Sequence, residues 1–435
     1  MKNKRASVNI RATSKIARFA IVLASTAIPV LTATPSARAG GILFYEIATP
    51  DVGLASAGYA ARADDASTVF KNPAGMNRLD GVQFQAGAQA LYGSLYFSPD
   101  AATSPRLGSG NGGNAVGWVP IAGLFITLPV APKWRVGLGT LTYFGTAVDY
   151  GNEWVGRYFV QKSTLIGVTL MPSVSFQATD WLSIGAGLNA MYGFTDAHVA
   201  VNNFVGPDGQ MRLNDTTWGF GAVAGILFQV SEKTRFGISY LSPVKLDFKA
   251  TPSFTGLGPV LAPLLANPPE LNLGVTVPQS VILSAYHALN PQWALMADFG
   301  WQNWNQFHNL RIEFNSGLQT TAINPEFHDT WHGAIGGQYR PSQEWLFSAG
   351  VAFDSSAANT ENRTFTLPIG QSWRFGLGAQ YHIRANVNIG VAETFAWIGD
   401  MSINQGTEVS AQGRVSGIYN NAWVSFTSLT LNWAF

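Results

Sequence analysis

The residue types that most often perform catalysis or bind metal ions are few in this sequence and form no recognisable site. The chain has no cysteine, which excludes disulfides and thiolate metal ligands. Two of its six histidines, His328 and His332, lie four residues apart in a stretch that alternates like a β-strand. In a strand that spacing separates two side chains by about 13 Å, too far to share one metal ion. None of the six lies in a nucleophile motif, so we expect neither an enzyme nor a bound cofactor.

The composition is poor in charge and rich in apolar and aromatic residues. Charged residues make up 12% of the chain and hydrophobic residues 47%, with 46 glycines and 14 tryptophans. Soluble domains usually carry about 25% charged residues. The formal net charge of +1 does not provide the broad basic surface that nucleic acid needs, so no nucleic-acid partner is expected. These proportions indicate a membrane protein.

The first 39 residues have the three parts of a secretory signal peptide. Six basic residues lie within the first 18 positions, the apolar run Phe19–Leu31 follows, and Ala37-Arg38-Ala39 fits the small-x-small cleavage rule. The apolar run is about 13 residues long, short of the roughly 20 that a transmembrane helix needs. We therefore assign residues 1–39 to a signal peptide.

The rest of the chain alternates in the way that a membrane-spanning β-barrel requires. Beyond residue 39 no apolar run is long enough for a spanning helix, and only closed sheets otherwise satisfy every backbone group in lipid. Along 182–192, Leu, Ile, Ala and Tyr side chains would line one face of a strand, and Ser, Gly and Asn side chains the other. Such stripes, often with aromatic ends as in interfacial girdles, recur at about 82–97, 116–130, 134–146, 163–178, 181–201, 214–230, 234–249, 275–289, 293–301, 327–340, 345–353, 371–382, 386–400 and 418–435.

The connections between these stripes support the same fold. Short turns such as Pro132-Lys133 and Asn290-Pro291 alternate with longer loops such as 202–213 and 250–274, as in outer-membrane barrels. A soluble β-sandwich is the rival architecture, but it would need polar outward faces. We therefore predict an all-β fold, a 14-stranded antiparallel transmembrane β-barrel that spans residues 81–435.

Residues 40–80 break the alternation and are rich in glycine and small polar side chains. A segment with so little apolar surface would not fold alone, whereas a barrel of fourteen strands encloses a lumen that it could fill. We therefore predict that residues 40–80 form a small N-terminal plug, called the hatch below. Asp64 and Asp65 in this segment are interpreted as structural hydrogen-bond acceptors.

The hatch sequence closely resembles that of the FadL-type family of long-chain fatty-acid transporters in Gram-negative outer membranes. The similarity rests on Asp-Asp-Ala-Ser-Thr-Val-Phe at 64–70 followed by Asn72-Pro73-Ala74. Asparagine bonds nearby backbone and proline fixes φ, so we expect this turn to hold the hatch against the wall. The terminal Phe435 resembles the signal read by the barrel assembly machinery. The resemblance implies an outer-membrane location, contact with lipid and lipopolysaccharide, and a monomer.

Candidate cargo-binding residues come partly from exposure and partly from this resemblance. The loop 250–274 places apolar side chains where water is expected, which usually marks a binding surface; the candidates are Leu257, Leu261, Leu264 and Leu265. The resemblance implies a pocket beside the hatch N-terminus, at Ile42 and Phe44, and a carboxylate anchor at Arg311. It also implies a lateral gate in the third strand, at Tyr143-Phe144-Gly145.

The expected function is passive uptake of long-chain fatty acids or similar hydrophobic compounds, with lateral release at the third strand. Where the family has a second basic residue on the fifth strand, this chain has Gly193-Phe194. Aromatic or alkane hydrocarbons that feed a degradation pathway are therefore an alternative cargo. A general porin and an outer-membrane hydrolase are further alternatives; the hatch argues against the first and the lack of a nucleophile motif against the second.

Overall fold

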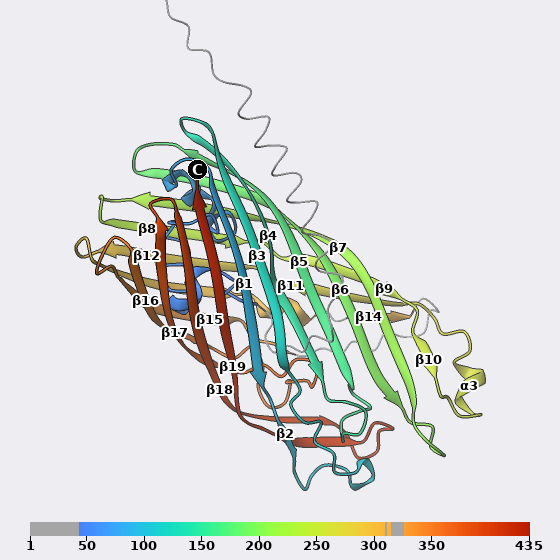
Figure 1. The fold of residues 1–435 in the computed structure, drawn as a ribbon. Coiled ribbons are helices and arrows are strands. Elements are labelled where there is room, and N and C mark those ends of the chain that lie inside the picture. The colour runs from blue at the N-terminus through green and yellow to red at the C-terminus, as the bar shows by residue number, and fades with distance from the viewer. Residues whose placement is uncertain (1–42, 309–310, 315–325) are drawn as a thin grey trace, which may run out of the picture. The chain divides into compact units, whose positions relative to one another are not determined.

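A computed structural model of the protein describes residues 43–308, 311–314 and 326–435, so the predicted signal peptide lies outside the described residues. Fourteen strands of the described chain form a closed antiparallel ring, in which β1 and β19 pair with each other and lie side by side in Figure 1, blue and red. In ring order they are β1 (Gln83–Ser94), β3 (Gly117–Ala131), β4 (Trp134–Asp149), β5 (Lys162–Gln177), β6 (Leu182–Val201), β7 (Gly209–Gln229), β8 (Thr234–Leu241), β12 (Ser280–Ala288), β13 (Trp293–Gln302), β15 (Thr330–Tyr339), β16 (Trp345–Asp354), β17 (Ser372–Arg384), β18 (Val387–Gly406) and β19 (Arg414–Ala434).

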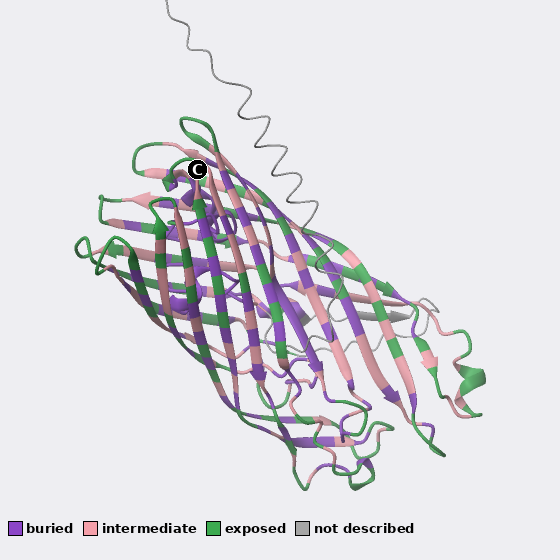
Figure 2. Ribbon diagram, in the orientation of Figure 1, coloured by how far each residue is buried: buried purple, intermediate pink, exposed green. Residues whose placement is uncertain are grey.

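The ring turns its apolar side chains outward, as the sequence pattern predicts. On β13, Trp293, Leu295 and Phe299 are exposed, whereas Met296 and Asp298 between them are buried. Figure 2 shows this alternation of buried and exposed residues along strand after strand. Because only an apolar exterior is stable against lipid, the pattern confirms the predicted all-β transmembrane barrel.

Two predicted strands, 234–249 and 275–289, are each interrupted by a proline. Pro243 follows β8 and Pro278 precedes β12; a proline has no N–H to give to a ladder. Beyond the interruptions the chain forms a separate three-stranded sheet in the order β14-β11-β9. Its strands are β9 (Val244–Ala250), β11 (Leu271–Val277) and β14 (Arg311–Phe314).

The remaining short elements lie in the connections. The expected loop 202–213 is shorter than predicted because β7 already begins at Gly209. No helix among the described residues is long and apolar enough to cross a membrane. The connecting elements are β2 (Phe97–Pro99), η4 (Pro105–Leu107), β10 (Ser253–Thr255), α3 (Leu261–Leu264) and η5 (Trp304–His308).

The hatch segment 43–79 lies within the ring and is almost entirely buried. It contains three short helical turns, η2 (Pro50–Leu54), α2 (Thr68–Lys71) and η3 (Pro73–Arg78). Asp298 on β13 accepts hydrogen bonds from the backbone N–H groups of Gly58 (3.1 Å) and Tyr59 (3.0 Å). A Cβ at Gly350 on β16 would lie 1.9 Å from the carbonyl oxygen of Leu54. Inward glycines therefore let the hatch backbone approach the wall.

Buried ion pairs hold the hatch together. Arg62 contacts Asp51 (2.8 Å), Asp64 (2.8 Å) and Asp65 (2.6 Å), and Lys71 forms an ion pair with Asp51. Burial opposes ionisation of Asp65, but Lys71 and Arg62 outweigh it and hold the pKa of this carboxyl well below its usual range. Both aspartates predicted to be structural acceptors thus contact the same guanidinium.

Candidate cargo-binding site

The turn Asn72-Pro73-Ala74 is bonded to the barrel wall. The Asn72 side-chain amide donates to the carbonyl oxygen of Ile226 on β7 (3.0 Å) and to that of Ala60 within the hatch (2.7 Å). Its Oδ1 accepts from the Ala74 N–H at 3.1 Å, while Pro73 begins η3, where a missing N–H leaves no bond unmade. The asparagine therefore joins two parts of the hatch to one strand.

The ladder between β3 and β4 ends before either strand does. Its last pair is Gly123 with Leu141, although β3 begins six residues earlier and β4 continues to Asp149. Over this stretch β3 pairs with β1, and β4 pairs with β5 through a register shift between Thr142 and Phe144. Beyond this stretch the Asp149 N–H donates to the carbonyl oxygen of Ala115 (2.9 Å), so the two segments are hydrogen-bonded again. We call the intervening break in the ladder the β3–β4 gap.

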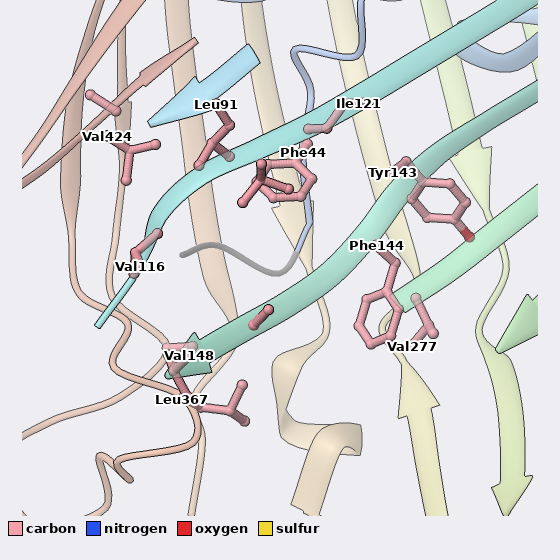
Figure 3. Packing of buried hydrophobic residues seen from close by; sticks show 14 of the residues in the cluster. Phe44, Leu91, Val116, Ile121, Tyr143, Phe144, Val148, Val277, Leu367 and Val424 are labelled. Atoms are coloured by element: carbon pink, nitrogen blue, oxygen red, sulfur yellow. The ribbon is translucent and has the colours of Figure 1, made fainter. Parts of the chain in front are cut away.

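The start of the hatch occupies the edge that this gap leaves on β4. Leu43 forms an antiparallel bridge with Phe144, and the Phe44 N–H donates to the carbonyl oxygen of Tyr143 at 2.9 Å. Figure 3 shows Phe44 between the strand that carries Ile121 and the strand that carries Tyr143 and Phe144. The predicted gate residues Tyr143-Phe144-Gly145 are thus brought next to the predicted pocket residue Phe44; Ile42 lies outside the described residues.

A cavity of about 140 Å³ is lined in part by the start of the hatch. Leu43 and Phe44 belong to its wall as well as to the contacts at the gap. Most of the remaining lining is apolar and includes Leu95, Ile369, Ile398, Val424 and Phe426. Its polar lining comes from Glu46, Gln302, Thr330, Asp354, Ser355, Ser372 and Arg374. The cavity can therefore surround an apolar molecule and present hydrogen-bonding groups to one part of it.

Arg374 is the cation of this cavity. It lies on the inward face of β17, and its Nη1 donates to both carboxylate oxygens of Glu46, at 2.8 and 2.7 Å. Its Nη2 donates to Asp354, which also lies 2.9 Å from Nδ1 of His332. In the sequence Arg374 lies between Trp373 and Phe375, so the alternation turns it inward. A charge there needs a partner, but nothing in the sequence identifies Glu46 as that partner.

The predicted anchor Arg311 is placed elsewhere by its backbone. It begins β14, opposite Gly274 of β11, in the three-stranded sheet rather than in the ring that carries Arg374. The prolines that interrupt two predicted strands create this second sheet, and the role of Arg311 as a carboxylate anchor stays a prediction.

The predicted apolar loop does present exposed side chains. Val260 is 68% and Leu264 73% exposed, while Leu257, Leu261 and Leu265 are half-buried. The neighbouring loop adds exposed Phe204 and Val205, and Asn203 there bonds Gly256 and Gly258, each at 2.8 Å. We call Phe204, Val205, Val260 and Leu264 the loop patch. The sequence-based prediction did not include Phe204 and Val205, although two apolar residues in an expected loop indicate a binding surface.

A line of serine, histidine and aspartate side chains lies between the hatch and the barrel wall. Among the residues that the structure describes, no group of three or more His, Asp or Glu side chains could hold a metal ion. Ser56 Oγ lies 3.3 Å from Nε2 of His332, whose other nitrogen faces Asp354, but Ser56 is fully buried in the hatch. A nucleophile needs room for a substrate carbonyl beside it, so this line of groups joins the hatch to the wall.

Comparison with known proteins identifies the family. Residues 30–435 match the model of the family described as outer membrane protein transport protein (OMPP1/FadL/TodX). The chain belongs to this family. The resemblance seen in the hatch sequence is thereby confirmed over almost the whole chain, and the outer membrane is the location of the barrel.

Relatives in this family match nearly the whole length of the chain at low identity. The long-chain fatty acid transport protein of Escherichia coli (strain K12) is 25% identical, over 94% of this chain and 97% of its own length. Outer membrane protein P1 of Haemophilus influenzae is also 25% identical, over 93% and 97%. Among solved structures, a Pseudomonas aeruginosa FadL homologue has a TM-score of 0.82 at 21% identity (91% and 100% covered). The Pseudomonas putida toluene transporter TodX has 0.66 at 17% (92% and 99%). These structures share the fold.

Proposed function

We propose that this family member takes up long-chain fatty acids or similar hydrophobic compounds passively across the outer membrane. Cargo first contacts the loop patch, then enters the cavity beside Arg374. It leaves sideways through the β3–β4 gap into the membrane, without crossing the hatch along the barrel axis. No energy source is needed because transfer from water to lipid is favourable for an apolar molecule.

One observation carries this proposal: the hatch start lines an apolar cavity and also contacts the edge of a break in the wall. Leu43 and Phe44 line the cavity and also contact β4 at the gap. A closed ladder would force cargo along the axis, where the buried hatch lies. A gap next to the cavity instead offers a route whose exit is lipid, the solvent that an apolar cargo prefers.

The named relatives support this class of cargo. The Escherichia coli relative is named a long-chain fatty acid transport protein and aligns over nearly its whole length. The loop patch exposes apolar side chains to water. Exposed apolar patches usually mark a binding surface, so this patch supports capture of an apolar cargo.

A specific observation also favours an uncharged cargo as the second candidate. Arg374 is already paired with Glu46 and Asp354, so the cavity holds two carboxylates for one guanidinium. A hydrocarbon would enter without disturbing these pairs. Uptake of oleate and of toluene by a deletion strain that carries the gene on a plasmid separates the two candidates, and transport of neither would contradict the proposal.

The route can be tested by cross-linking the hatch to the gap. Leu43 and Phe144 are directly opposed in an antiparallel bridge, where Cα atoms are about 4.5–5.5 Å apart, within the span of a disulfide. Because the natural chain has no cysteine, the pair Leu43→Cys and Phe144→Cys can form only this disulfide within one molecule. We expect oxidation to stop uptake and dithiothreitol to restore it.

The two single-cysteine variants are the matched controls for this experiment. They should import cargo equally well under oxidising and reducing conditions, because neither can tie the hatch to β4. Full uptake by the cross-linked double variant would contradict the lateral route.

A further inference from the structure

We propose that a second copy of this chain docks against the lipid-facing side of β18 and β19, where Glu393 and two hydroxyl side chains form a polar site within the apolar belt. The contact makes a two-fold symmetric dimer, in place of the monomer that the family resemblance implies. The inference goes beyond the proposed uptake and does not depend on which cargo is carried.

Glu393 is a carboxylate on the outward face of the barrel. Along β18 the residues two positions away on either side, Val391 and Phe395, are exposed. The neighbouring Thr394 faces the other way, because its hydroxyl donates to the carbonyl oxygen of Val52 in the hatch. Since successive side chains of a strand point to opposite faces, Glu393 points toward the lipid.

The depth of Glu393 is the middle of the apolar belt. It pairs directly with Leu377 of β17, and Leu377 lies halfway between Trp373 and Tyr381, two outward aromatics toward the ends of that strand. Aromatic girdles mark the two interfaces of a transmembrane barrel, so Leu377 and Glu393 lie near the bilayer centre. An ionisable side chain at this depth is costly and indicates a functional site with a partner.

The hydrogen bonds that the described chain gives to Glu393 do not use the full capacity of its carboxyl group. The hydroxyls of Ser425 and Thr427 on β19 donate to its two oxygens. An ionised carboxylate accepts about four hydrogen bonds, and a neutral one has an O–H to donate. The outward neighbours Leu377 and Val391 are apolar, and lipid tails offer no polar group. The remaining capacity is therefore open to a group from another molecule.

A second copy presents matching groups at the required depth. A two-fold axis along the membrane normal leaves every residue at its own depth, so the polar sites of the two copies meet at the belt centre. A neutral carboxyl both donates and accepts, so two facing Glu393 side chains complement each other, and the hydroxyl oxygens of Ser425 and Thr427 can accept further bonds. Polar side chains hold membrane-embedded segments together in this way.

The wall beside Glu393 is hollowed where the second barrel would rest. A hollow of about 600 Å³ on this outer face is lined by Glu393 and by residues of β15, β16, β17 and β18, which are neighbours in the ring. Its small outward residues Gly337 and Ala349 let two membrane-embedded surfaces approach closely. Leu377, which pairs with Ala349 and is 68% exposed, forms a ridge beside them. A symmetric contact can place each ridge in the hollow of the other copy.

The dimer is tested on the purified barrel, reconstituted alone in phosphatidylcholine vesicles. A spin label attached at Val409→Cys, an exposed position in a chain without natural cysteines, reports a second labelled copy by dipolar coupling. We expect coupling when this is the sole substitution, and its loss when Glu393→Leu is added. Glu393→Gln should keep it, because the amide also donates and accepts.

Filling the hollow provides a second test with a matched control. Ala349→Trp places a bulky side chain in the hollow and should abolish the coupling. Ala186→Trp places the same side chain on the outward face of β6, which β1, β3, β4 and β5 separate from β19, and should leave the coupling unchanged. Both variants should keep the heat-modifiable gel band of a folded barrel, because both side chains point into lipid.

A purely structural role of Glu393 predicts different results. If the carboxyl only joins β18 to β19, Glu393→Leu should lower the resistance to unfolding by urea and leave the coupling unchanged, and that result contradicts the proposal. We expect no loss of resistance, since an apolar side chain suits the lipid face. Absence of coupling in vesicles also contradicts the second copy; coupling confined to native outer membranes would assign the site to another protein. The proposed function is judged separately by oleate uptake.

Discussion

At the residue scale, inward-facing glycines of the barrel leave space for the hatch because they have no side chain. Gly350 and Gly87 face the hatch so closely that a Cβ would lie 1.9 Å from the Leu54 oxygen and 1.8 Å from the Ala48 oxygen. At these glycines the backbone of the barrel wall and the backbone of the hatch are in direct contact. The hatch is held in the barrel both by close backbone contacts at glycines and by hydrogen bonds to the wall.

Replacement of Gly350 by valine should unseat the hatch. The branched side chain would have to displace the Leu54 backbone, and overpacking of this kind typically costs about 1–3 kcal/mol. We expect larger steady conductance in planar bilayers and greater sensitivity of cells to large antibiotics. Gly333→Val on β15 is the matched control, because nothing lies within 4 Å of a Cβ there. Equal conductance of the two variants would contradict this account.

At the element scale, the strands were predictable and the relations between them were not. Alternation alone located most of the ring strands within a few residues, since outward and inward side chains meet different solvents. Alternation gives no signal for the β3–β4 gap, because both strands continue beyond the last residue pair of their ladder, Gly123 with Leu141. Pro243 and Pro278 were visible signals of the second sheet. Arg374 and Glu46, 328 positions apart, are paired only by the closed fold.

The loop patch should govern capture of cargo at low concentration. The double substitution Val260→Ser with Leu264→Ser removes two exposed apolar side chains, each of which contributes roughly 1.5 kcal/mol or more when a ligand covers it fully. We expect the oleate concentration for half-maximal uptake to rise several-fold, with the maximal rate unchanged. Val409→Ser, in another loop and 95% exposed, is the control for general surface effects. A change in maximal rate alone would place the patch outside the capture step.

At the scale of the whole molecule, the two faces of the barrel meet different surroundings, lipid outside and the hatch inside. The outer face is apolar and dissolves the barrel in lipid, while the inner face is small and polar and holds the hatch with its buried ion pairs. In the proposed route, cargo passes from one to the other where the ladder opens. The last strand, β19, closes the ring through its pairing with β1, so assembly of the barrel is complete only when these two strands meet.

We propose that Phe435 is read during that assembly, because it ends the outward stripe of β19 and is 61% exposed. Phe435→Ser should lower the amount of heat-modifiable barrel in the outer membrane several-fold, yet leave spontaneous folding into lipid vesicles unchanged, since no assembly machinery acts there. Phe375→Ser on β17 removes an outward aromatic of similar exposure, 48%, and is the control for lost lipid contact. If both variants assemble equally in cells, or if Phe435→Ser also fails in vesicles, the terminal residue acts through stability rather than recognition.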